Sequence, residues 1–373
     1  MFFTLLHFNN FDKKNDAWKV LNNNVKLTDA KELDNKHLDG LEILRFLMAM
    51  MVIVYHVAMW IPNSFTEGNL SLIKYTAGHT VPIFWCLSGF VFNFKYSKAI
   101  CLDKLSFKKY SLARFSRLYP LALLTLVLTC LLQLRYEKLN TLSFVFHKGD
   151  PYHFFLNAFM ISHWGFQRFT AFNGPVWSIS VEIIVYIVFF VVCRFAGRSP
   201  LLIVGMLLLG KVLAHIEPDL TNHLPVSTCI TSFYSGCLVQ LGYEKMKGKF
   251  GLKQSLVLLG IFLTIFVCHI LFSGKFDFLL SVPATVYIFQ VLFSSPSQYL
   301  TSASKYLGSL TYASYMLHFP VLLASVLILD SFGIERSVVG TPAFMWIFIA
   351  SVLILSRVSF LYFEGPLQRL IRR

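Results

Sequence analysis

Long apolar runs separated by short polar and basic loops fill the chain from about residue 39 onward. An α-helix that crosses a bilayer needs about 20 mostly apolar residues. Ten runs approach that length, near 41–61, 78–94, 117–134, 176–195, 200–216, 224–242, 255–273, 277–293, 306–329 and 341–363. They predict an all-α polytopic membrane protein, in which residues 39–373 form one bundle of about ten transmembrane helices.

Two further segments do not fit the pattern of simple spans. The run 152–167 is amphipathic and interrupted by histidines, so we interpret it as an interfacial or re-entrant piece. Residues 1–38 are mostly polar and rich in Asn, Lys and Asp, which predicts a cytoplasmic tail.

The composition agrees with a membrane protein. Of 373 residues, 56% are apolar and 14% are charged, whereas soluble domains average about 45–50% and about 25%. The composition therefore argues against a disordered chain and against an ordinary soluble enzyme. The seven cysteines are odd in number and form no C-x-x-C pair. We expect neither a disulfide framework nor a metal site from them.

The charge of the loops predicts the orientation. The chain has 33 Lys and Arg against 19 Asp and Glu, and the basic residues concentrate in alternate loops. Because basic loops stay on the cytoplasmic side, both termini are expected to be cytoplasmic, in an inner (cytoplasmic) membrane. The positive charge is spread over many short loops, which argues against a nucleic-acid partner.

The first span carries two ionisable groups, Arg45 and His56, eleven residues apart. On an α-helix this spacing places them within about 20° of one face and roughly 16 Å apart along the axis. Ionisable groups inside a span are costly and usually functional. Two plainer interpretations stay open: Arg45 can snorkel to the interface, and His56 can be a hydrogen-bonded packing residue.

Polar residues also mark the second and third spans. Ser88 and Gly89 allow close helix contact. Arg114 and Arg117 share a helix face at the cytoplasmic rim. They are either a positive-inside stop or a phosphate clamp, since a guanidinium group binds phosphate through paired hydrogen bonds.

The fourth and ninth spans carry the remaining candidates. Trp177, Ser178 and Glu182 open the fourth span, and a buried carboxylate such as Glu182 needs a partner or a proton. In the ninth span, Tyr315 and His318 are three residues apart and are neighbours on one helix face.

Taken together and in order, these residues resemble the membrane-bound acyltransferase 3 family, which O-acylates cell-surface carbohydrates. The resemblance covers about residues 38–370. It consists of Arg45-x10-His56, Leu87–Phe90, Arg114–Pro120, Trp177–Glu182 followed by Tyr186, Gly308–His318 and Glu364–Pro366. Two features depart from the family pattern. Val81–Trp85 lacks an Asp found there in the family, and we expect no hydrolase-like domain of the kind fused to some members.

The resemblance implies transfer of an acetyl group from cytoplasmic acetyl-CoA to a hydroxyl of a surface or lipid-linked glycan, such as O-antigen or exopolysaccharide. No bound cofactor is implied. The expected partners are acyl-CoA, the glycan acceptor and membrane lipids, with a homodimer as one candidate assembly. The expected donor-binding residues are Arg45, Ser88, Arg114 and Arg117, and the expected acceptor-binding residues are Trp177, Ser178, Tyr315 and His318.

For catalysis we expect His56 to be the general base, with Glu182 orienting either His56 or the acceptor. A covalent acyl-histidine intermediate is an alternative chemistry, and Ser88, Tyr315 or His318 is the candidate oxyanion donor.

Two other function classes remain. A flippase for lipid-linked glycans would have comparable spans, but we find no inverted repeat. A non-catalytic scaffold would not be expected to contain these ionisable groups, because burying them in a membrane is energetically costly.

Overall fold

The computed structural model describes residues 38–60, 70–140, 143–146, 149–167, 169–216, 225–246, 278–293 and 297–372, with the single positions 257 and 260. The predicted span 255–273 lies essentially outside these described residues. So does nearly all of the predicted tail, 1–38.

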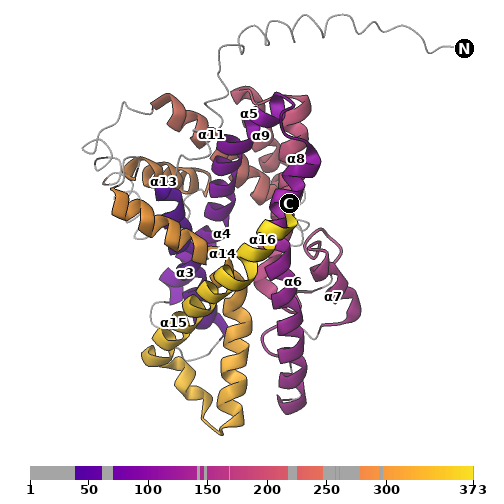
Figure 1. Cartoon of the computed structure of the whole chain (residues 1–373), viewed down its shortest axis with the longest axis vertical. Helices are drawn as coiled ribbons and strands as arrows, with labels where there is room; N and C mark the ends of the chain where they lie inside the picture. The colour runs from indigo at the N-terminus through magenta and orange to yellow at the C-terminus, as the bar shows by residue number, and fades with distance from the viewer. Residues whose placement is uncertain are drawn as a thin grey trace, which may run out of the picture. The chain divides into compact units, whose positions relative to one another are not determined.

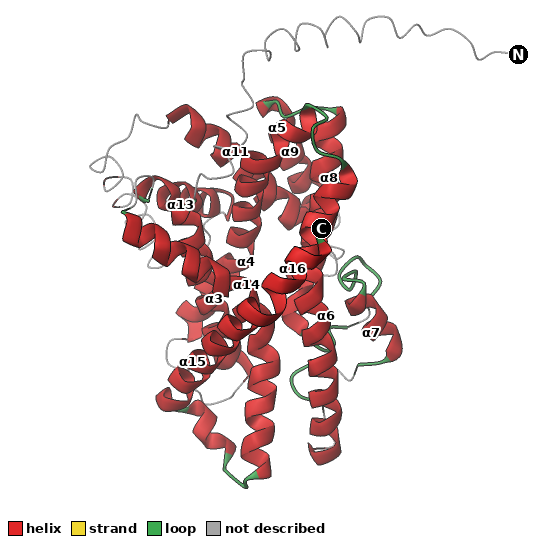
Figure 2. Ribbon diagram, viewed as in Figure 1, coloured by secondary structure: helices red, strands yellow, loops and turns green. Residues whose placement is uncertain are grey.

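The described part of the chain is mostly helical and contains no β-strand (Figure 2). Its longer helices are α3 (Asp39–Trp60), α4 (Leu70–Phe92), α6 (Phe107–Asn140), α8 (Trp177–Phe195), α9 (Pro200–Ile216), α11 (Val226–Met246), α13 (Phe278–Leu292), α14 (Gln298–Ser331) and α15 (Pro342–Ser359). The shorter ones are α5 (Lys98–Cys101), α7 (Pro151–Ala158), α16 (Gly365–Ile371), the 3-10 turns η3 (Gly174–Val176) and η4 (Arg336–Gly340), and two π-helical segments, η2 (Asn93–Ser97) and η5 (Phe360–Glu364).

Five stretches among the described residues are long and apolar enough to cross a membrane. They are Asp39–Ala58, Phe107–Asn140, Gly174–Phe195, Gln298–Ser331 and Pro342–Ile371. Helices α4, α9, α11 and α13 coincide with four further predicted spans. The chain is therefore a multi-pass, all-helical membrane protein, as predicted. The number of ten spans and the orientation of the termini stay predictions.

The segment 152–167 contains only the short helix α7, followed by turns. Eight helical residues rise about 12 Å, far less than the roughly 30 Å of a bilayer core. Asp150 caps this helix by accepting a hydrogen bond from the His153 backbone N–H at 2.7 Å. An additional α-helical span is thus ruled out here, and an interfacial or re-entrant position remains the interpretation.

Helices α4 and α11 touch backbone to backbone. A Cβ added at Gly89 would lie 1.8 Å from the Phe233 carbonyl oxygen, and one added at Gly236 would lie 1.9 Å from the Cys86 carbonyl oxygen. No side chain fits in either place, so the two helices are fixed against each other by small residues. The close helix contact expected of Ser88-Gly89 is made by Gly89.

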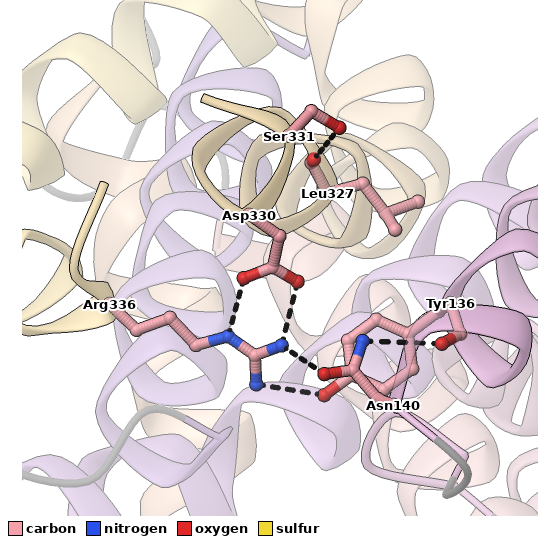
Figure 3. Close-up of polar contacts among 6 residues, drawn as sticks. All are labelled: Tyr136, Asn140, Leu327, Asp330, Ser331 and Arg336. Atoms are coloured by element: carbon pink, nitrogen blue, oxygen red, sulfur yellow. Dashed lines mark hydrogen bonds and ion pairs between the residues drawn. The ribbon is translucent and has the colours of Figure 1, made fainter. Parts of the chain in front are cut away.

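Helices α6 and α14, of 34 residues each, pack against each other in the bundle (Figure 1). The connection from α14 to α15 is held to α6 by Arg336, whose guanidinium donates to the Asp330 carboxylate, the Tyr136 hydroxyl and the Asn140 side-chain oxygen (Figure 3). After η5, helix α16 returns to α6, where Arg372 Nε donates to Ser116 Oγ at 2.8 Å. Helix α6 is thereby tied to the C-terminal part of the chain at two places, near Ser116 and at its last residues.

Candidate active site

A cavity lies among helices α3, α4, α6, α8 and α14, with Lys95 of η2 also in its wall. Seven of the ten predicted site residues line it, namely Arg45, Ser88, Arg114, Arg117, Ser178, Glu182 and Tyr315. These residues come from five separate helices. The fold thus brings together side chains that span 271 positions of the sequence. The other three predicted residues, His56, Trp177 and His318, are not part of its lining.

One part of the cavity wall is basic and is organised by Glu42. Arg45 Nη1 lies 2.9 Å from both carboxylate oxygens of Glu42, one helical turn earlier. Gly308 on α14 makes room for this pair, because a Cβ there would lie 2.3 Å from Glu42 Oε2. Glu42 was not among the predicted site residues, although its spacing of three from Arg45 is a recognisable ion-pair signal.

Arg114 is held by aromatic rings. Its guanidinium lies 5.0 Å from the Phe92 ring centroid and 5.1 Å from that of Tyr96, and its Nη2 donates to the Tyr96 hydroxyl. Its Nε is buried, and no residue in the described part of the chain accepts a hydrogen bond from it. Stacking fixes the plane of the group while leaving donor capacity, which suits a planar cation that binds an anionic ligand.

Arg117 belongs to the same basic cluster. It is close enough to Arg45, Arg114 and Glu42 to interact with each electrostatically. With Lys95, the cluster places four cationic side chains in the cavity wall against the two carboxyl groups of Glu42 and Glu182. The excess positive charge gives this part of the cavity a potential that favours an anionic ligand.

Ser178, Glu182 and Tyr186 occupy successive turns on one face of α8, and all three line the cavity. Glu182 is buried, and its carboxyl group interacts with the hydroxyls of Ser88 and Tyr186 and with the charges of Arg45 and Arg114. The predicted donor-binding Ser88 and the predicted catalytic Glu182 are therefore neighbours.

His56 and His318 form a hydrogen-bonded pair. His56 Nδ1 lies 2.8 Å from His318 Nε2, and the two rings are parallel within 3°. His318 Nδ1 lies 2.7 Å from the Tyr315 carbonyl oxygen, which can only accept. In the neutral pair His318 thus has its proton on Nδ1, His56 donates through Nδ1, and the lone pair of His56 is on Nε2.

Tyr315 connects the histidine pair to the cavity. Its hydroxyl lies 2.9 Å from Ser178 Oγ and 2.8 Å from the Pro175 carbonyl oxygen. His318 follows one turn later on α14, beyond the cavity-lining residues Thr311, Tyr312 and Tyr315. Since Arg45 and His56 are roughly 16 Å apart along α3, the basic cluster and the histidine pair lie towards opposite ends of this region.

Trp177 packs beside the cavity against other aromatic residues. It meets Trp85 edge to face at 5.7 Å, and the His163 ring is 5.9 Å away. Burial lowers the pKa of His163, in the connection before α8, to about 4, so its imidazole is neutral near pH 7. His163 was not among the predicted site residues, and the mixture of histidines and aromatics in 152–167 was its only sequence signal.

A comparison with known families matches residues 38–359 to a model described as an acyltransferase domain, type 3. The chain belongs to the acyltransferase 3 family. Comparisons with curated proteins and with solved structures give no match. The family match covers most of the chain and includes both the cavity and the histidine pair, so membrane acyltransferase activity is supported for the same region.

One element of the resemblance, Glu364–Pro366, lies outside the stretch that matches the acyltransferase 3 model. Glu364 is buried at the end of η5, and its Oε1 accepts a hydrogen bond from Ser359 Oγ at 3.0 Å. This contact ties together the π-helical turn that leads into α16. Val81–Trp85 is the segment that differs from the family pattern. Its Trp85 Nε1 donates a hydrogen bond to the Ser178 carbonyl oxygen at 3.3 Å and so connects α4 to α8.

Proposed function

We propose that this protein is an O-acyltransferase that moves an acetyl group from cytoplasmic acetyl-CoA to a hydroxyl of a cell-surface or lipid-linked glycan. The observation that supports it most directly is the pairing of two sites in one bundle. A cluster of cations lies in the cavity wall, and a histidine pair with a defined tautomer lies one turn beyond the cavity lining.

The donor binds with its phosphates at the basic cluster. Arg114 is oriented by Phe92 and Tyr96 and offers hydrogen bonds to a phosphate, and Arg45 and Arg117 add positive charge beside it. The pantetheine arm then extends through the cavity and brings the thioester towards Tyr315 and the histidine pair. The roughly 16 Å between Arg45 and His56 along α3 is compatible with the length of that arm.

His56 acts as the general base. As the acceptor oxygen forms its bond to the thioester carbonyl carbon, Nε2 of His56 takes the hydroxyl proton. The C–S bond then breaks, and the protonated His56 returns the proton to the leaving thiolate, so free CoA and the ester are the products. His318 accepts from His56 Nδ1 and thereby holds the ring and stabilises the imidazolium that forms.

The acceptor occupies the region around Ser178, Tyr315 and His318, with Trp177 as the aromatic surface for a sugar ring. In this proposal both termini of a ten-span bundle are in the cytoplasm, so that the donor enters from the cytoplasmic face. The acceptor then enters from the opposite face of the inner membrane.

The test is acetyl transfer from labelled acetyl-CoA in isolated membranes, with surface glycan as the acceptor. His56→Ala in a correctly inserted protein is expected to lose at least about a hundredfold of the rate, the usual contribution of general base catalysis. His215→Ala, at the exposed end of α9, removes a histidine away from the site and is the matched control.

Two results would contradict the proposal. Transfer by His56→Ala at the wild-type rate would remove His56 from the chemistry. If wild-type membranes move the glycan across the bilayer but transfer no label, the activity is that of a flippase.

A further inference from the structure

Glu182 is buried in the cavity wall with a carboxylate oxygen that has no assigned task. Only 9% of the residue is exposed, and no residue in the described part of the chain hydrogen-bonds its Oε1 atom. A buried acceptor of this kind is costly when it is left without a donor. The side chain lines the cavity, so a bound molecule can supply the missing donor.

The surroundings of Glu182 restrict what that donor can be. A phosphate would be repelled by the carboxylate, so the polyanionic part of a ligand stays at Arg45, Arg114 and Arg117. Along α8, Glu182 lies one turn from Ser178, which contacts Tyr315 next to the histidine pair. Glu182 also interacts electrostatically with Arg45 and Arg114. It therefore lies between the basic cluster and the reaction end of the cavity.

The part of coenzyme A between its phosphates and its sulfur is the pantetheine arm, which carries two amide N–H groups. An amide N–H is the donor that a buried carboxylate oxygen accepts well, and a hydrogen bond to a charged group contributes more than a neutral one. The hydroxyls of Ser88 and Tyr186, beside Glu182, can complete the polar surface for the same amide.

We propose that Glu182, with Ser88 and Tyr186, recognises an amide of the pantetheine arm and so positions the thioester, instead of orienting His56 or the sugar. This inference rests on the proposed acyl-CoA donor. Glu182 is then a determinant of donor specificity, which makes the enzyme select pantetheine thioesters.

The experiment compares two ligands that share the nucleotide and differ in the arm. Equilibrium binding of labelled CoA and of 3′-phospho-ADP, which lacks pantetheine, is measured on the full chain in lipid nanodiscs. Glu182→Leu and Glu182→Met both remove the acceptor, so the result does not depend on one variant folding. Glu182→Gln keeps a carbonyl oxygen of the same shape.

The apolar variants are expected to bind CoA about tenfold more weakly and 3′-phospho-ADP as well as wild type does, while the CoA affinity of Glu182→Gln, which keeps the acceptor oxygen but loses the charge, lies between those of wild type and the apolar variants. Arg114→Ala, in contrast, is expected to weaken both ligands. An unchanged CoA affinity in the apolar variants would overturn the inference and leave the acceptor role for Glu182. An equal loss for both ligands in the folded variants would also overturn it. Wild-type protein that binds neither ligand would instead remove the proposed donor itself.

Discussion

The guanidinium groups of Arg336 and Arg114 show two opposite uses of the same side chain. All three guanidinium nitrogens of Arg336 donate hydrogen bonds within the protein. It binds both oxygens of Asp330 at 2.7 and 2.8 Å, donates to Tyr136 and Asn140, and lies over the Tyr136 ring (Figure 3). Its hydrogen bonds hold the loop between α14 and α15 against α6.

Arg114 is held in orientation, but not all of its hydrogen-bond donors are used. Two aromatic rings and one hydroxyl hold it, and its Nε has no acceptor among the described residues although it is buried. It also lines the cavity, whereas Arg336 does not. The comparison indicates that an arginine whose nitrogens all donate within the protein stabilises the fold, while an oriented arginine with spare donors in a cavity wall is available to a ligand.

The largest effect is expected for the basic cluster that contains Arg114. Arg114→Ala combined with Arg117→Ala is expected to raise the KM for acetyl-CoA by about tenfold to a hundredfold, because phosphate loses charge-assisted hydrogen bonds. Steady-state kinetics in membranes measure it. Arg114→Lys should recover only part of the loss, since an ammonium group lacks the planar fork that stacks on Phe92 and Tyr96. An unchanged KM in the double variant would contradict the phosphate site.

An intermediate effect is expected where the basic cluster depends on close packing. In Gly308→Ala, the new Cβ would meet Glu42 Oε2 at 2.3 Å and displace the carboxylate that pairs with Arg45. We expect a severalfold loss of kcat/KM for acetyl-CoA with the protein still folded. Gly205→Ala on α9 is the control, because nothing lies within 4 Å of its added Cβ. Equal activity of the two variants would show that the Glu42–Arg45 pair is not needed for donor binding.

The smallest effect is expected for Arg336. Arg336→Ala is expected to lower the free energy of unfolding by about 1 kcal/mol, the upper range for exposed ion pairs, and to leave the KM for acetyl-CoA unchanged. Thermal unfolding in detergent measures the shift. Arg135→Ala removes an equal charge from the exposed surface of α6 next to Tyr136 and is the control. A changed KM in Arg336→Ala would break the distinction between the two arginines.

Features that depend on residues near each other in the chain could be predicted from the sequence. Arg45 and His56 share one helix, and the order of motifs from Arg45 to His318 was enough to indicate the family. Apolar runs located the helices well, although α6 begins at Phe107, ten residues before the predicted span. The start of this helix contains polar residues such as Lys108 and Lys109, so a hydropathy pattern does not detect it.

Features that depend on packing between distant helices could not be predicted. His56 forms its hydrogen bond with His318, 262 positions away, and the sequence analysis identified both residues without pairing them. Glu182 was expected to orient His56 or the acceptor, but which neighbours surround it depends on how α4 and α8 face each other. The periodicity of a sequence predicts which face of a helix is buried, but it does not predict which other helix packs against that face.

The π-helical turn η2 makes the number of residues between α4 and α5 as important as their identity. In a π-helix each hydrogen bond spans one residue more than in an α-helix. Deleting one of the three residues between Phe92 and Tyr96 would restore α-helical bonding and reduce the separation of these two aromatic residues from four positions to three, which changes how their rings face each other. The two rings could then no longer flank Arg114 together. A single-residue deletion at this turn, with every charged side chain intact, would therefore disorganise the anion site.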